Sequence, residues 1–215
     1  MIYLDNAAST AVHPEVVKEM LPYFDLQYGN PSSIHQFGRK AKNAIQKARK
    51  QVAALIGAEP DEILFTSGGT ESNNTILYGI PKSRGPKFVL NHIITSSIEH
   101  EAILEPCRDL EKNGVKVTYL PVDEHGIVNP NDITNLVNPQ TVIVSVMFAN
   151  NEVGTIQPIK EISKICNKYQ IPLHTDAVQA VGKVPINVKE LGVDALSISS
   201  HKINGPKGVG ALFIK

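Results

Sequence analysis

Short apolar runs rich in β-branched residues alternate along the chain with longer stretches of helical periodicity. Several of these runs carry apolar residues on both faces, which is typical of strands covered by helices above and below. We expect seven strands, at residues 62–66, 92–96, 116–120, 142–147, 172–175, 195–199 and 209–214. Strands that alternate with helices predict an α/β fold, with a mainly parallel, doubly wound sheet and helices on both faces.

Two stretches have the period of amphipathic helices. Residues 39–56 place their apolar side chains on one side and most of their basic side chains on the other, which indicates a solvated outer face rather than a binding patch. Residues 159–169 form the second expected helix. The last strand follows the loop 204–208, which is too short for a parallel crossover, so we expect this strand to be antiparallel.

The composition is that of a protein with small-molecule substrates. A length of 215 residues suits one large domain, or one domain with a small appendage. Lys+Arg and Asp+Glu are equal at 21 each, so no net charge favours nucleic acid or an acidic membrane surface. No stretch approaches the roughly 20 apolar residues of a membrane span, and the N-terminus lacks the basic flank and apolar core of a targeting signal. We therefore expect a cytoplasmic protein.

The two cysteines, Cys107 and Cys166, are too few and too far apart for a disulfide framework or a metal site. Each lies at helical spacing from leucine or isoleucine residues, which predicts two buried thiols that take no part in chemistry. The chain stops directly after the last expected strand without a closing helix, which indicates a fragment of a longer protein.

The first motif that suggests chemistry is FTSGGTESNN, residues 65–74, where a strand ends and a helix begins. Gly68 and Gly69 allow a tight turn, and Thr70 and Glu71 open the helix. Backbone N–H groups at such a helix N-terminus attract anions, so the motif predicts a phosphate cradle. An ordinary helix cap explains the motif equally well when it is seen alone.

Asp176 follows a short buried strand in LHTDAVQ, residues 173–179, and Gln179 lies about one helical turn beyond it. A carboxylate at this depth needs a cationic partner or several donors. The protonated ring nitrogen of pyridoxal phosphate (PLP) would be such a partner. The alternative is an aspartate that caps the following helix.

Lys202 comes directly after an apolar strand in SISSHKINGPKG, residues 197–208. A lysine at a strand end beside a cofactor can form a Schiff base, and a less polar site lowers its pKa toward the reactive amine. Ser199, Ser200 and His201 can donate hydrogen bonds to a phosphate. The alternative, a solvated loop lysine, fits Lys207 better than Lys202.

Two further strand ends carry polar side chains. His100 follows the strand that ends near Ser96, and its imidazole can stack on a heteroaromatic ring, although a lone histidine is more often structural. Asn150 and Asn151 end the central strand and can bind a substrate carboxylate or a ring hydroxyl. Because ligands bind at the carboxyl ends of the strands in open α/β sheets, we expect these motifs to meet in one site.

Taken together and in this order, the motifs resemble the NifS/IscS-type cysteine desulfurases, which belong to the class-V aminotransferase family of fold-type-I PLP enzymes. The matching segments are 3–10 (YLDNAAST), 28–35 (YGNPSSIH), 65–74, 96–107 (SSIEHEAILEPC), 149–159 (ANNEVGTIQPI), 174–183 (HTDAVQAVGK) and 201–212 (HKINGPKGVGAL). The resemblance covers essentially the whole chain, and seven motifs in register make it specific.

The resemblance implies a role for each candidate residue. Lys202 would be the Schiff-base lysine and shuttle the α-proton, and Asp176 would hold the proton of the pyridine nitrogen. His100 would stack on the ring and move protons, Gln179 would bond the ring hydroxyl, and Asn151 would touch the substrate or the ring oxygen. The phosphate would be bound by Gly69, Thr70, Ser199 and His201. No metal is implied.

The resemblance also implies an architecture and an activity. Residues 16–215 would form the PLP-binding large domain, residues 1–15 would belong to the small domain, and most of the small C-terminal domain would be absent. The full enzyme would convert L-cysteine to L-alanine and pass the sulfur as an enzyme persulfide to an acceptor or scaffold protein, for iron–sulfur clusters or thiolation. It would be a homodimer when full length.

The sequence departs from the family pattern in three respects. Asn204 stands where the family more usually has tyrosine, and we expect this difference to be minor. The family's persulfide cysteine and a substrate-binding arginine lie beyond position 215, and neither Cys107 nor Cys166 occupies a matching motif. A selenocysteine lyase, a small aminotransferase and a non-catalytic PLP-binding or assembly fragment therefore stay open as alternatives.

Overall fold

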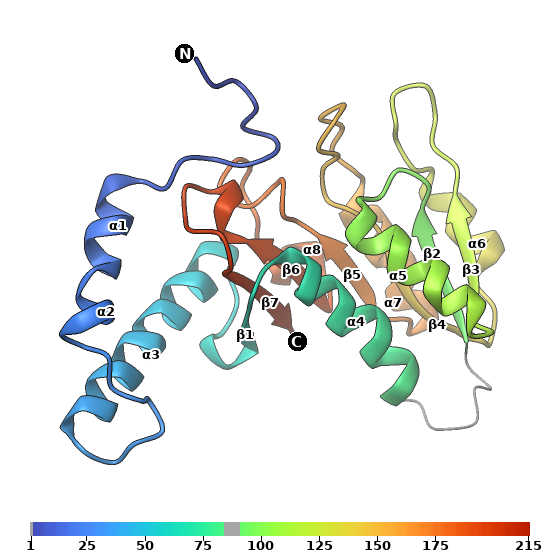
Figure 1. Ribbon diagram of the computed structural model, residues 1–215. Coiled ribbons are helices and arrows are strands. Elements are labelled where there is room, and N and C mark those ends of the chain that lie inside the picture. The colour runs from blue at the N-terminus through green and yellow to red at the C-terminus, as the bar shows by residue number, and fades with distance from the viewer. Residues whose placement is uncertain (1, 84–90) are drawn as a thin grey trace.

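The computed structural model describes residues 2–83 and 91–215 and contains one seven-stranded sheet (Figure 1). The strand order is β1-β7-β6-β5-β4-β2-β3. The strands are β1 Ile63–Thr66, β2 His92–Ser96, β3 Lys116–Leu120, β4 Thr141–Ser145, β5 Leu173–Asp176, β6 Ala195–Ser199 and β7 Gly210–Ile214. All seven strands that the apolar runs predict are present, so the expected sheet is confirmed.

The strand directions follow the expectation from connection length. The five strands β2 to β6 are parallel to one another, whereas β7 is antiparallel to both β6 and β1. Only a short loop with a single turn of 3-10 helix, Ser200–Lys202, joins β6 to β7. A parallel connection needs a longer crossover, so this loop forces the chain to turn back.

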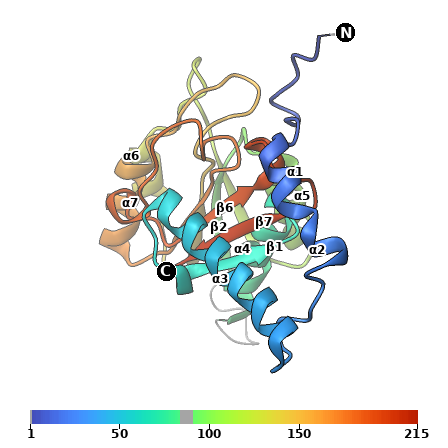
Figure 2. The same ribbon diagram turned by 90° about the vertical axis from the view of Figure 1, so that its left-hand side faces the viewer.

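Helices cover both faces of the sheet, as Figures 1 and 2 show. The helices are α1 Pro14–Met20, α2 Pro22–Asp25, α3 Gln36–Ile56, α4 Gly69–Ser83, α5 Glu101–Lys112, α6 Pro130–Leu136, α7 Ile159–Tyr169 and α8 Val188–Leu191. The predicted helix 39–56 begins three residues earlier, at Gln36, because His35 caps it: His35 Nδ1 accepts a hydrogen bond from Gly38 N at 3.5 Å. The predicted helix 159–169 is α7.

Two apolar cores lie on opposite faces of the sheet. Adjacent residues of β2 point to different cores: Ile93 packs with residues of α4 and α5, and Ile94 packs with residues of α3, α6, α7 and α8. Every residue of β2, β4, β5 and β6 is buried. Strands enclosed on both faces carry apolar side chains on both faces, so their positions could be recognised in the sequence.

Both thiols are buried, as the helical spacing predicts. Cys107 lies on the inner side of α5 and Cys166 on the inner side of α7, and neither forms a disulfide. Burial raises the pKa of each thiol to about 12. Within the described parts of the chain, no helix has both the length and the apolar character that crossing a membrane requires.

Candidate active site

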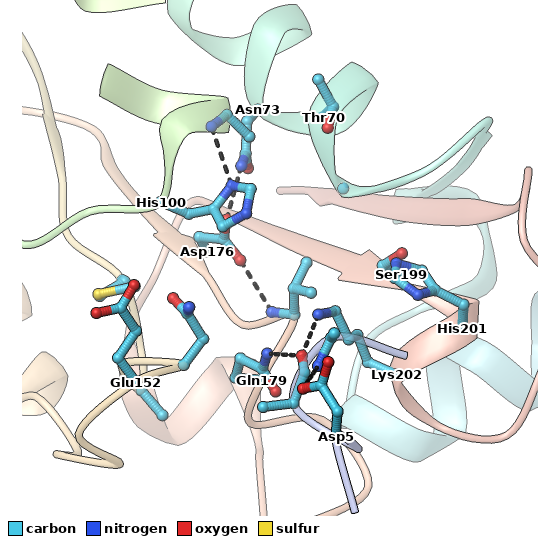
Figure 3. A pocket seen from close by; sticks show the side chains of 18 residues that line it. Asp5, Thr70, Asn73, His100, Glu152, Asp176, Gln179, Ser199, His201 and Lys202 are labelled. Carbon is cyan, nitrogen blue, oxygen red and sulfur yellow. Dashed lines mark hydrogen bonds between the residues drawn. The ribbon is translucent and has the colours of Figure 1, made fainter. Parts of the chain in front are cut away.

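A cavity of about 550 Å³ opens at the carboxyl edge of the sheet (Figure 3). Its walls come from the first turn of α4, the N-terminus of α5, the loops after β4, β5 and β6, and the N-terminal segment. The nine residues carried over from the family all line it: Gly69, Thr70, His100, Asn151, Asp176, Gln179, Ser199, His201 and Lys202. The structure therefore brings together residues that lie up to 133 positions apart, from 69 to 202.

Asp176 is the last residue of β5 and is buried, with 7% of its surface exposed. Asp176 Oδ2 accepts a hydrogen bond from Asn73 Nδ2 at 2.7 Å, and Oδ1 accepts one from Val178 N at 2.9 Å. Across residues 2–83 and 91–215, no ion pair involves this carboxylate. Burial raises its pKa against these hydrogen bonds, so the site would favour a cation beside it.

One local expectation about Asp176 is wrong. Residues 178–183 form consecutive turns rather than a helix, so Asp176 does not cap a helix and Gln179 does not lie one helical turn on. The bond from Val178 N to the carboxylate closes a tight side-chain turn, which is a common alternative use of aspartate. The sequence could not separate these two local structures, because aspartate favours both.

Lys202 and Gln179 converge on one backbone carbonyl. Lys202 Nζ donates to Ala7 O, and Gln179 Nε2 donates to the same oxygen at 2.8 Å (Figure 3). Gln179 Oε1 accepts a hydrogen bond from Lys183 Nζ at 2.7 Å. Burial and then the nearby charge of Lys183 lower the pKa of Lys202, so its amine reaches the neutral, nucleophilic form more readily.

Another part of the cavity wall has the groups that an anion needs. α4 begins at Gly69, so the first backbone N–H groups of this helix have no partner within the helix. A Cβ built on Gly69 would lie 2.7 Å from Val178 Cγ2 and 3.7 Å from Ser199 Cβ, so this helix end lies directly against the strand end that carries Ser199. Burial lowers the pKa of the half-buried His201.

His100 and Asn151 line the side of the cavity formed by α5 and the loop after β4. His100 is the N-cap of α5, and its Nδ1 accepts a hydrogen bond from Ala102 N at 3.0 Å. Asn150 does not line this cavity, because its Oδ1 accepts from Glu152 N at 2.8 Å and from Val153 N at 3.0 Å. The structure thus separates the two asparagines: Asn150 holds the loop, and Asn151 faces the site.

Ser200 is not part of the candidate site. It does not line the cavity. Its side chain lies against Gly205, because a Cβ built on Gly205 would lie 1.9 Å from Ser200 Oγ. Of the three residues that precede Lys202, only Ser199 and His201 face the cavity. The reason is the 3-10 turn that begins at Ser200 and changes the direction of the chain.

Two groups of site residues are missed by sequence reasoning. Asn73, on the buried face of α4, donates to Asp176, and its Oδ1 is buried without a partner in the described chain. Its only signal in the sequence is a polar side chain on the inner face of a helix. Asp5, Ala7 and Ala8 also line the cavity, and Ala7 acts through its main-chain oxygen, which no side-chain pattern reveals.

Two buried titratable groups support the strands under the site. Glu99 Oε1 accepts from Ser96 Oγ at 2.5 Å and from Met147 N at 2.8 Å, and its other oxygen is buried without a partner among the described residues. Burial raises the pKa of Glu99 to about 8. His174 bonds Ser145 Oγ at 2.8 Å and Ser197 Oγ at 2.9 Å, and burial lowers its pKa to about 3.

These shifts predict the dependence of stability on pH. Between pH 4.5 and about 8 the folded protein keeps a proton on Glu99 that the unfolded chain has lost, so the free energy of unfolding falls as pH rises. For His174 the unfolded chain binds the extra proton between about pH 3 and 6.5, so stability rises with pH there. Below pH 6.5 the two groups change the free energy of unfolding in opposite directions. Above pH 6.5 only Glu99, of these two, still makes stability depend on pH.

We therefore expect Glu99→Gln to remove part of the loss of stability above pH 6.5. Between pH 6.5 and 8 the wild type should lose roughly 1.5 kcal/mol more than the variant, because the slope of about 1.4 kcal/mol per pH unit halves as the pH reaches the pKa of about 8. Urea unfolding at the two pH values measures this difference. Equal losses in both proteins would show that Glu99 is ionised throughout that range.

Comparison with known proteins identifies relatives along the whole chain. The family model for aminotransferase class V matches residues 2–215. The cysteine desulfurase IscS of Dictyoglomus turgidum is 55% identical over 214 residues, which cover 100% of this chain and 54% of the relative. The cysteine desulfurase IscS of Methanosarcina thermophila is also 55% identical over 214 residues, which cover 100% of this chain and 52% of that protein.

Solved structures agree with the sequence relatives. A NifS-like protein superposes with a TM-score of 0.96 at 44% identity, covering 100% of this chain and 59% of its own. A structure of SspA in complex with cysteine gives a TM-score of 0.96 at 41% identity, covering 100% of this chain and 61% of its own. The chain thus spans about half the length of the curated relatives that it matches.

Proposed function

The chain belongs to the class-V aminotransferase family, whose cofactor is PLP, and we propose that it forms the cofactor-binding part of a cysteine desulfurase. The observation that carries the proposal is one cavity lined by all nine family site residues, with a buried carboxylate and a half-buried amine in its walls. Cysteine is the proposed substrate because a relative of 41% identity is described in complex with it.

The residues around the cavity fit PLP. The buried carboxylate of Asp176 has no ion-pair partner in the described chain, which suits a cofactor that brings its own cation. The N-terminus of α4, with Gly69 beside Ser199, suits a phosphate. The volume of about 550 Å³ lies within the usual range for small-molecule sites.

The residues that would attach the cofactor and move protons are Lys202, Asp176 and His100. Lys202 would attach the cofactor and then, with its Nζ released, take and return the α-proton of the substrate. Asp176 would hold a proton on the ring nitrogen through its carboxylate. His100 would cover one side of the ring, and its Nε2 would transfer a proton. When bound, PLP supplies an electron sink that makes the bonds around the α-carbon of an amino acid easier to break.

Gln179 and Asn151 would orient the ring oxygen and the substrate, and Gly69, Thr70, Ser199 and His201 would bind the phosphate. In the structure the Gln179 amide is bonded to Ala7 O and Lys183, so its proposed contact requires an exchange of partners. Asn151 has a half-buried side chain at the cavity wall, consistent with contact to a ligand.

The division of the chain and its partners are also proposals. Residues 1–15 would contribute to a smaller domain and 16–215 would form the large domain. The exposed apolar side chains of Ile2 and Leu4, more than 80% accessible, support a further packing partner for the first of these segments. The whole protein would be a homodimer that hands sulfur to an acceptor or scaffold protein.

The function is tested by supplying L-cysteine and a thiol reductant to the PLP-loaded protein, in the form that its gene encodes, and measuring L-alanine and sulfide. Parallel assays with selenocysteine and with amino acid and keto acid pairs separate a desulfurase from a selenocysteine lyase or an aminotransferase. Preferred turnover of cysteine supports the proposal. A preference for either alternative substrate, or bound PLP with no turnover at all, would overturn it.

Neither Cys107 nor Cys166 is expected to carry the transferred sulfur. Both thiols are buried, and burial raises the pKa of each to about 12, so almost no thiolate forms and a substrate cannot approach it. Mass spectrometry after incubation with cysteine should find no persulfide on either peptide. Cys107→Ser and Cys166→Ser should each retain the wild-type yield of alanine, and a persulfide that disappears in one of them would contradict this.

A further inference from the structure

The N-terminal segment, residues 5–13, lies along the loop that carries Lys202. Thr10 N donates to the carbonyl of His201 at 2.8 Å, and Thr10 Oγ1 donates to the same oxygen at 2.9 Å. His13 N donates to the carbonyl of Asn204 at 2.9 Å. Two separate backbone contacts therefore fix both the position and the direction of the segment.

Asn204 contributes its backbone and its side chain to this contact. Its backbone N–H donates to Thr10 Oγ1 at 2.8 Å, its carbonyl accepts from His13, and its side-chain Nδ2 donates to the carbonyl of Ala11 at 3.1 Å. Its backbone is left-handed, with φ of +61°. Asparagine tolerates this conformation better than most residues with a side chain.

The other end of the segment forms part of the cavity. Asp5, Ala7 and Ala8 line it, and the carbonyl of Ala7 receives both Lys202 Nζ and Gln179 Nε2. Because the Lys202 amine donates to this carbonyl, the position of the amine depends on the position of Ala7. The backbone of Thr10 and His13 is bonded to the loop only a few residues from Ala7, so these bonds restrict the movement of the Ala7 carbonyl.

We propose that Asn204 is a positioning residue, which seats residues 5–11 against the loop after β6 so that Ala7 O holds the Lys202 amine. The proposal rests on the proposed function only in naming Lys202 as the reactive lysine. Asparagine suits this place in two ways: its amide donates to Ala11, and it tolerates a positive φ better than most residues with a side chain.

The test compares Asn204→Gly with the wild type after PLP has been removed with hydroxylamine. Glycine keeps the left-handed backbone and loses only the amide, so it isolates the contact with Ala11. Hydrogen exchange at the amides of Thr10 and His13 should accelerate by about 2- to 10-fold, which corresponds to one neutral hydrogen bond. Acetylation of Lys202, measured by mass spectrometry relative to the exposed Lys207, should rise by a similar factor.

Two further variants complete the test. Thr10→Val removes the hydroxyl that bridges His201 and Asn204, so it should raise both readouts as Asn204→Gly does. Gln170→Gly is the matched control, because Gln170 has φ of +55° at the end of α7 and does not line the cavity. This control should leave exchange at Thr10 and acetylation of Lys202 unchanged.

Wild-type exchange and labelling in Asn204→Gly would overturn the proposal. A further variant, Asn204→Ala, forces a residue with a Cβ into the left-handed backbone, so an effect in this variant alone would report backbone strain. The proposal also fails if Gln170→Gly changes Lys202 labelling as much as Asn204→Gly does. Neither readout uses bound PLP or turnover. Failure of the desulfurase assay would therefore overturn the proposed function and leave the role of Asn204 to be decided by these measurements.

Discussion

Replacing Lys202 with alanine is expected to abolish covalent attachment of PLP and to lower turnover by at least about 10²- to 10⁴-fold, the usual contribution of a positioned acid–base group. Lys202 is half-buried in the wall of the cavity, and burial lowers its pKa toward the reactive neutral amine. Borohydride reduction of the PLP-loaded wild type should place the label on the peptide that contains Lys202. The absorbance of the protein-bound cofactor and the mapped peptide measure the two effects.

Lys207 provides the matched control for this experiment. It lies in the same loop but is exposed and does not line the cavity, so Lys207→Ala should bind PLP and turn over as the wild type does. Lys183 is the stricter competitor, because burial lowers its pKa too and its amine bonds Gln179. A reduced label on Lys183 or Lys207 instead of Lys202 would refute the assignment.

The sheet could be predicted because its central strands are enclosed on both faces. β2 is placed residue for residue at His92–Ser96. The expected strand 142–147 instead runs Thr141–Ser145, although Val146 and Met147 stay buried. Apolar residues indicate burial, which continues past Ser145. The end of a strand depends instead on the last backbone hydrogen bond to a neighbouring strand, so strand boundaries are harder to predict from the sequence than the strands themselves.

The candidate site could be predicted where a polar side chain follows a buried strand. Asp176 and Ser199 meet that condition, because side chains at the carboxyl ends of parallel strands share one edge of the sheet. Asn73 could not be predicted, since it acts from the inner face of a helix. Ala7 could not be predicted for another reason: its main-chain carbonyl makes the contact, and any residue type has this group.

Position 204 shows the limit of comparing a sequence with a family pattern. An asparagine in place of a tyrosine predicts little when only side-chain chemistry at the site is considered. In the structure Asn204 has a left-handed backbone, and its polar groups bond Thr10, Ala11 and His13. The information lies in contacts between the two ends of the chain, which a local motif does not contain.

Replacing Asp176 with alanine or asparagine is expected to weaken PLP binding by tenfold or more and to cripple turnover. The carboxylate is buried and has no ion-pair partner in the described chain, so a cationic ring nitrogen would lose its counter-charge. Hydrogen bonds to charged groups contribute roughly 1.5–3 kcal/mol, which corresponds to about 10- to 150-fold in affinity. Titration of PLP, followed by absorbance or fluorescence, measures the change.

Asp176→Asn is the sharper variant, because it removes the charge and keeps the shape. Its oxygen can still accept from Val178 N. In the wild type Asn73 Nδ2 donates to the carboxylate, so a flip of the Asn73 amide lets the new amide donate to the Asn73 oxygen, which has no partner in the described chain. Since burial raises the pKa of Asp176, the charge is unfavourable in the folded protein without PLP. Urea unfolding should therefore show no loss of stability in this variant while its PLP affinity falls.

Asp194→Asn controls for the loss of an aspartate at the same strand. Asp194 Oδ2 accepts from Leu173 N at 2.9 Å, at the end of β5 opposite the cavity, so its replacement should leave PLP affinity within about twofold of wild type. A fall in affinity confined to the Asp176 variants locates the counter-charge at the carboxyl end of β5. Equal affinity in Asp176→Asn and wild type would leave Asp176 as no more than the acceptor that closes the Val178 turn.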